Sequence, residues 1–148
     1  MSRNMQWAEK VLQPLAVVLL ISGAAIVAVF SYLSFAPVSV VDFKNVYVLK
    51  DKLKPGDILG FHLEYCKKRK LPASVYPRIQ GDQAVFFLPS FIADVDKGCA
   101  NYDIKTFTVP TNAMPGKYRL YVDTVYDVTS FRKVTETFTT NEFEVVVE

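Results

Sequence analysis

Apolar residues follow two different patterns along this chain. No charged residue occurs between positions 11 and 41, and the run Leu15–Ala36 is interrupted only by three serines and one glycine. After position 41, apolar and polar residues alternate in short runs that are rich in β-branched and aromatic side chains. The first pattern is typical of a membrane-spanning helix and the second of β-strands. We therefore expect one spanning helix followed by an all-β domain.

The apolar run is long enough to cross a bilayer, which takes about 20 residues. A cleaved signal peptide is the alternative, but its apolar core is usually only about 7–15 residues long. The one small-x-small cleavage motif, Ser34-Phe35-Ala36, is followed by Pro37, which would hinder cleavage. An uncleaved signal-anchor helix at 14–36 is therefore predicted, with Pro14 in its first turn, where a missing N–H costs little.

The basic residues that flank the run nearly balance, so they do not decide its orientation. Folded domains translocate largely regardless of their charge, which leaves the short N-terminal tail as the natural cytoplasmic side. We expect residues 1–13 in the cytoplasm, a single pass through the inner (cytoplasmic) membrane, and an extracytoplasmic, periplasmic domain at 37–148.

Small side chains occupy one face of the predicted helix at Ala24, Ala28 and Ser31. Such a face lets two helices approach closely, which would allow a homo-oligomer, although small residues are common in spanning helices for other reasons. The run contains no ionisable residue, and this disfavours a channel, a proton relay or a transporter.

The domain after the run has the periodicity of strands. Leu59, Phe61, Leu63 and Tyr65 occupy alternate positions and define the buried face of one strand. The expected strands cover 38–49, 58–66, 74–80, 83–94, 103–109, 117–128 and 134–147. Turn residues separate them at short intervals, and no stretch after position 37 has a sustained 3.6-residue apolar period. Seven strands in about 110 residues predict a β-sandwich.

The segment Ala113–Leu120 (AMPGKYRL) refines this prediction. Its Pro115-Gly116 turn followed by Tyr118 resembles the tyrosine corner of immunoglobulin-like domains. The resemblance implies that the Tyr118 hydroxyl binds backbone upstream and that Leu120 fills a core position. The Trp and the inter-sheet Cys pair of antibody domains are absent, so the expected fold is a divergent immunoglobulin-like β-sandwich preceded by one transmembrane helix.

The layout of the whole chain is similar to that of small membrane proteins encoded by tailed bacteriophages. A short inner tail, one span, a compact β domain and the closing PGKYRLYV…FEVVV run carry this resemblance. No Asn begins an Asn-x-Ser/Thr sequon, which favours a bacterial or viral source over a eukaryotic cell surface.

The two cysteines, Cys66 and Cys99, are candidates for a disulfide. In an immunoglobulin-like plan one strand ends at Cys66 and its antiparallel neighbour begins just after Cys99, which brings the thiols within reach. An even number of cysteines in an extracytoplasmic domain supports the bridge, whereas two unpaired thiols are expected if the domain faces the cytoplasm.

The chain has few residues suited to catalysis or to binding a metal ion. His62 is the only histidine, and no nucleophile elbow accompanies any serine. Zinc and copper sites need more His and Cys ligands than the chain has. Asp94, Asp96 and Asp103 outline a calcium loop but lack its glycine and closing Glu, so a solvated acidic loop is the simpler interpretation. We expect no catalysis, no cofactor and no metal.

The densest charge cluster is Lys67-Lys68-Arg69-Lys70. Four adjacent cations on a loop are expected to be solvated or matched by an anionic surface. The functional interpretation is a contact with lipid head groups, envelope phosphates or an acidic protein, and the alternative is an ordinary solvated loop. The net charge of +2 gives no reason to expect nucleic acid as a partner.

These features predict a non-enzymatic, membrane-anchored immunoglobulin-like module that binds a protein partner at the cell envelope or in an assembly. The alternative is a phage-encoded envelope effector that acts in lysis, superinfection exclusion or virion assembly. An enzyme of a kind without a visible motif is a third possibility.

Overall fold

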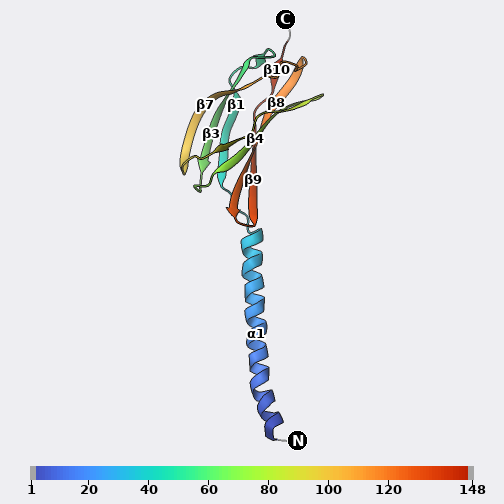
Figure 1. The fold of residues 1–148 in the computed structure, drawn as a ribbon. Helices are drawn as coiled ribbons and strands as arrows, with labels where there is room; N and C mark the ends of the chain where they lie inside the picture. The colour runs from blue at the N-terminus through green and yellow to red at the C-terminus, as the bar shows by residue number, and fades with distance from the viewer. Residues whose placement is uncertain (1–2, 147–148) are drawn as a thin grey trace. The chain divides into compact units, whose positions relative to one another are not determined.

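The computed structural model describes residues 3–146, with side chains from residue 13 onward. The chain divides into two units, Met1–Pro37 and Val38–Glu148. The first contains the helix α1 (Arg3–Phe35), and its stretch Gln13–Phe35 is long and apolar enough to cross a membrane (Figure 1). None of that stretch is buried against protein, so its apolar side chains match a lipid environment.

The helix begins earlier than predicted. Pro14 lies inside α1 and not in its first turn. Most residues between Arg3 and Pro14, such as Met, Gln, Ala, Glu, Lys and Leu, are good helix formers, and they extend the helix toward the N-terminus. Proline is tolerated inside spanning helices because local adjustments satisfy the freed carbonyl.

The second unit consists of strands. Their bounds are β1 (Val41–Val48), β2 (Lys52–Leu53), β3 (Ile58–Lys67), β4 (Ala73–Gly81), β5 (Val85–Phe87), β6 (Phe91–Ala93), β7 (Gly98–Thr108), β8 (Gly116–Thr129), β9 (Arg132–Thr139) and β10 (Phe143–Val145). One sheet has the order β1-β3-β7, and the other has the order β2-β10-β8-β4-β5, with β6 paired to β4 and β9 paired to β8. All of these pairings are antiparallel except that of β10 with β2.

Two of the predicted strands are each divided in the structure. The stretch 83–94 forms β5 and β6, which pair with different parts of β4 and are separated around Pro89. Pro77 is fully buried in β4, an interior strand. Its carbonyl accepts the Leu88 N–H in the gap between β5 and β6. The stretch 134–147 forms β9 and β10, because the chain leaves β8 at Thr140 and rejoins it at Phe143.

Both sheets contribute to one hydrophobic core. The alternation predicted for β3 is confirmed, since Leu59, Phe61, Leu63 and Tyr65 are all buried. Phe61 contacts Phe138 of the other sheet, with ring centroids 6.0 Å apart. The sheets are not closed on themselves, because β7 ends one sheet and β5 and β6 form the edge of the other.

Tyr118 opens β8 with the geometry that the tyrosine-corner resemblance implies. It is buried, and its hydroxyl donates a hydrogen bond to the carbonyl of Met114 at 2.9 Å. The ring packs on Phe143 of β10 and on Phe86 of β5. The corner therefore fixes the turn at residues 110–116 to the end of the larger sheet.

Candidate functional site

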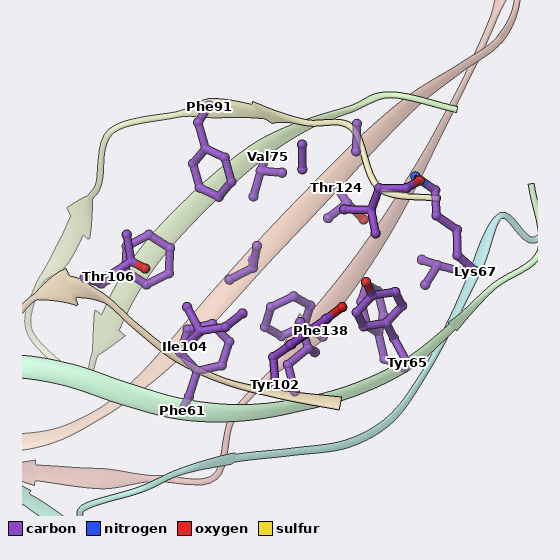
Figure 2. Close-up of a pocket in the computed structure, with 18 of the residues that line it drawn as sticks. Phe61, Tyr65, Lys67, Val75, Phe91, Tyr102, Ile104, Thr106, Thr124 and Phe138 are labelled. Carbon is purple, nitrogen blue, oxygen red and sulfur yellow. The ribbon is translucent and has the colours of Figure 1, made fainter. Parts of the chain in front are cut away.

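A cavity of about 330 Å³ lies between the two sheets of the domain. Its walls come from β1, β3 and β7 on one side and from β4, β6, β8 and β9 on the other (Figure 2). Most of the lining side chains are aromatic or aliphatic. We refer to it as the inter-sheet cavity.

The inter-sheet cavity reaches solvent between two edge strands. Its exposed lining residues are Tyr102 and Thr106 of β7, Phe91 of β6, and Val95, which follows β6. Tyr102 keeps 54% of its surface exposed although it lines the cavity. Neither β6 nor β7 has a second strand partner among residues 3–146, and the Phe91 ring of β6 lies 6.5 Å from the Phe107 ring of β7.

Lys67 lies at one end of the inter-sheet cavity and is only 5% exposed. This corrects the prediction that residues 67–70 form one solvated cationic loop. Lys67 is the last residue of β3, and it points to the same face as Leu63 and Tyr65. The alternation of buried positions along β3 predicts that Lys67 is buried, because residue 67 comes two positions after the buried Tyr65.

Backbone carbonyls hold the Lys67 ammonium. Its Nζ donates hydrogen bonds to the carbonyls of Leu71 and Val95, each at 2.7 Å, and lies 5.8 Å from the centre of the Tyr126 ring. Burial lowers the pKa of Lys67, although the carboxylates of Asp94 and Asp96 act in the opposite direction. Burial likewise raises the pKa of Tyr126. This end of the cavity thus carries a desolvated positive charge.

The other members of the basic cluster lie on the surface. Lys68 pairs with Asp42 at 2.8 Å, and Lys70 pairs with Asp96 at 2.7 Å. Arg69 is exposed. The hydrogen bond from Lys68 lowers the pKa of Asp42, and that from Lys70 lowers the pKa of Asp96. Two of the four cations therefore already have partners within the domain, which leaves Arg69 as the member most available to an external anion.

Cys66 and Cys99 are adjacent across β3 and β7. They are directly paired in the register of the two strands, and their Sγ atoms lie at a disulfide distance of 2.10 Å. The bridge ties the end of β3 to the start of the edge strand β7. It therefore lies one residue from Lys67, at the same end of the inter-sheet cavity.

His62 contacts residues of the two neighbouring strands, β1 and β7. Its Nδ1 lies 2.8 Å from the Asp103 carboxylate, and its ring stacks on Tyr47. Asp94 and Asp96 are exposed on the loop after β6. No cluster of three or more His, Cys, Asp or Glu residues suited to a metal ion occurs among the residues that the structure describes.

An exposed apolar surface, which the sequence did not single out, lies on β5 and β6. The eleven residues 83–93 contain no charge, and they form β5, β6 and the turn between them. Phe87 is 82% exposed and Ile92 is 76% exposed, and Val85 and Phe91 are also exposed. We call residues 83–93 the apolar edge. The absence of charge between Asp82 and Asp94 was visible in the sequence, but which of these side chains face solvent depends on the pairing with β4.

Comparison with known proteins does not assign the chain. No protein family matches it, and no curated protein sequence matches it. Similar solved structures include the Pseudomonas fluorescens alkylpurine DNA glycosylase AlkC bound to DNA containing an abasic site analog (TM-score 0.42, 14% identity) and the Bacillus subtilis sporulation control protein Spo0M (TM-score 0.36, 14% identity). A β-glucosidase from Listeria innocua has a TM-score of 0.36 at 12% identity.

These structural alignments cover 79%, 75% and 72% of this chain, respectively. The chain spans only 33%, 51% and 17% of the three proteins. Likenesses of this size, to proteins that differ widely from one another, support no assignment of fold family, substrate or activity.

Proposed function

We propose that this protein is a non-enzymatic, membrane-anchored module that binds a protein partner through its apolar edge. The observation that carries the proposal is the exposure of Phe87 and Ile92 on a strand edge that has no charged residue. Proteins usually protect such edges with charges or a covering segment, because an open edge pairs with other chains. A contiguous exposed apolar patch is likewise a mark of an interaction site.

The geometry of the apolar edge suits an added strand. β5 and β6 use one side for β4, and their outer side has no strand partner in the described structure. An extended segment of a partner would form backbone hydrogen bonds there and place alternate side chains beside Phe87 and Phe91. The partner expected from this chemistry is a protein with an exposed, mainly apolar β-strand.

We further propose that the domain is a divergent immunoglobulin-like sandwich outside the cytoplasm, with the N-terminus inside. The Tyr118 hydrogen bond to Met114 supports the fold proposal. The Cys66–Cys99 pair supports the location, because disulfides persist in oxidising compartments. The helix stretch Gln13–Phe35 supports an anchor in the inner membrane.

Site-specific photocrosslinking in native membranes tests the partner proposal. A photoreactive residue is placed at position 87 or 92 in the full chain, and adducts are identified by mass spectrometry. The matched control is position 47, where Tyr47 is 46% exposed on β1 of the other sheet. One dominant protein adduct from 87 and 92, absent from 47, is expected. Equal adducts from all three positions, or an adduct only between two copies of this chain, would overturn the proposal.

Thiol accessibility tests the location separately. In intact native membranes Cys66 and Cys99 should resist alkylation until a reductant is added, and protease added to the outer side should cut the domain. Full alkylation without reductant, together with a domain that the external protease leaves intact, would place the domain in the cytoplasm.

A further inference from the structure

The Lys67 ammonium has an unused hydrogen-bonding capacity. An ammonium carries three N–H donors, and the carbonyls of Leu71 and Val95 accept two of them. Among residues 13–146, Lys67 has no third acceptor within hydrogen-bond distance and no carboxylate within salt-bridge distance. Buried cations are normally paired with an anion, whereas the carboxylates of Asp94 and Asp96 act on Lys67 only from beyond salt-bridge distance.

Lys67 is the one charged side chain among the described residues that line the inter-sheet cavity. Lys67 and Tyr65 lie at one end, and Phe61, Ile104 and Phe91 lie toward the other (Figure 2). Lys67 and Phe61 are six residues apart on one strand, which corresponds to about 20 Å. A single acyl chain extends across half of the bilayer hydrocarbon, or about 15 Å. The volume of about 330 Å³ lies at the lower end of the range for small-molecule sites, so the space suits one chain.

We propose that the inter-sheet cavity binds an amphiphile with a single acyl chain and an anionic head group. The acyl chain lies between the sheets, and an oxygen of the head group accepts the third N–H of Lys67. A free fatty acid and a lysophospholipid share this chemistry. The membrane that α1 is suited to cross contains such molecules, and the opening between β6 and β7 provides the route of entry. Phe91 belongs both to this cavity and to the apolar edge. The inference does not depend on a protein partner, because the acyl chain lies between the sheets and not along the outer side of β5 and β6.

Photolabelling of the full chain in native membranes tests the inference without any mutation. Three probes carry the same diazirine-bearing acyl chain: a fatty acid, its methyl ester and a lysophosphatidylglycerol. Labelling of peptides from β3, β7 and β8 is measured by mass spectrometry. It is divided by the labelling of α1, which reports contact with bulk lipid in the same sample.

A charge-assisted hydrogen bond in a desolvated site is expected to favour an anionic probe over the methyl ester by about tenfold. Preference for the fatty acid alone identifies a carboxylate ligand, and preference for the lysophospholipid identifies a phosphate-bearing one. Equal labelling by all three probes, or labels confined to α1, would overturn the inference.

Substitution of Lys67 tests the role of its charge. Lys67→Met keeps most of the apolar stem. It should abolish the preference, so that the anionic probes and the methyl ester label the cavity about equally. The matched control is Lys68→Met, which removes the neighbouring surface cation that pairs with Asp42 and should preserve the preference. An undiminished preference in Lys67→Met would overturn the inference.

Folding of the variants is checked by protease resistance and by the retained Cys66–Cys99 bridge. If Lys67→Met fails to fold, Ala93→Phe provides an independent test. Ala93 is a small, half-buried residue that lines the cavity, so a phenyl group should obstruct it and lower cavity labelling by all three probes. Unchanged labelling of β3, β7 and β8 in a folded Ala93→Phe variant would show that the probes bind elsewhere.

Discussion

One carboxylate oxygen of Glu136 accepts the backbone N–H of Val40 at 2.7 Å, although the two residues are 96 positions apart. The other oxygen accepts the N–H of Val41 at 2.8 Å. Both valines are buried, so neither donor has ready access to water. A single side chain of β9 in the larger sheet therefore holds the start of β1 in the smaller one.

Replacing Glu136 by Ala is predicted to lower the free energy of unfolding by about 2–4 kcal/mol, because two buried N–H groups lose a charged acceptor. Glu136→Gln keeps one acceptor oxygen and should cost about half as much. Both losses in unfolding free energy are measured by unfolding the full chain with urea in detergent. Tryptic cleavage of the domain reports the unfolded fraction. Glu144→Gln, which removes an exposed partner of Lys52, should change stability by less than about 1 kcal/mol. Equal effects of Glu136→Ala and Glu144→Gln would contradict the proposed role of Glu136.

Removing the bridge with Cys66→Ala and Cys99→Ala is expected to cost about 3–4 kcal/mol, because the bridge closes a loop with a sequence separation of 33. The loss should appear as a lower urea midpoint for the domain. Wild-type protein with added reductant provides the matched comparison and should fall to the same midpoint. A midpoint that is unchanged in both samples would show that the bridge does not form in the membrane-bound protein.

Gly81→Ala is predicted to destabilise the domain by about 1–3 kcal/mol. A β-carbon at position 81 would lie 2.6 Å from the Tyr118 ring and 2.9 Å from the Lys117 carbonyl oxygen, and neither the buried ring nor the backbone can move easily. The control is Gly60→Ala, where the closest atom is the flexible side-chain end of Leu49 at 3.1 Å. The Gly81 variant should have the lower thermal midpoint, and the reverse order would contradict the packing at the tyrosine corner.

The environment of Asp123 predicts how the stability of the domain depends on pH. Burial acts to raise its pKa, but hydrogen bonds from Thr137 and Arg78 outweigh burial and hold the pKa below the ordinary value of 3.8. The carboxylate therefore contributes stability that is fully present above pH 3.8 and is lost as the pH falls through the folded-state pKa. Asp123→Asn should cost about 1 kcal/mol at pH 7, because the pair is partly solvent-screened.

The difference in stability between wild type and Asp123→Asn should shrink below pH 3.8. Unfolding in urea at pH 7, 4 and 2.5 measures it. A difference that stays constant across this range would show that the Asp123 pKa is not shifted by folding.

Hydrophobic patterns within single segments predicted the helix and the strand face that depend mainly on neighbouring residues. The uncharged run predicted a helix, and the alternation from Leu59 to Tyr65 predicted the buried face of β3. The charge cluster at 67–70 predicts a loop, but the strand period continues through Lys67, which is the last residue of β3. Burial there depends on the carbonyls of Leu71 and Val95, which only the tertiary fold brings to the ammonium.

The inter-sheet cavity could not be predicted from the sequence. The apolar residues that line it are the same kinds that fill a closed core, and periodicity reports only which face is buried. Whether two sheets meet tightly depends on side chains from strands far apart, such as Phe43 and Phe138. The division of 83–94 into β5 and β6 likewise depends on long-range pairing, because Pro89 marks a break without saying which part of β4 each half will join.

Strand β7 pairs with β3 along its whole length, has further anchors at its two ends, and carries mostly exposed side chains between them. The bridge from Cys99 to Cys66 secures its beginning, and the buried side chains of Phe107 and Val109 secure its end. The two anchors should prevent β7 from fraying at its ends. Its middle can still separate from β3 when several backbone hydrogen bonds open together. Amide exchange should accordingly be fastest near Tyr102 and slow at both ends. Reduction of the bridge should add fraying from Gly98, so amide exchange at the start of β7 should become faster in the reduced protein.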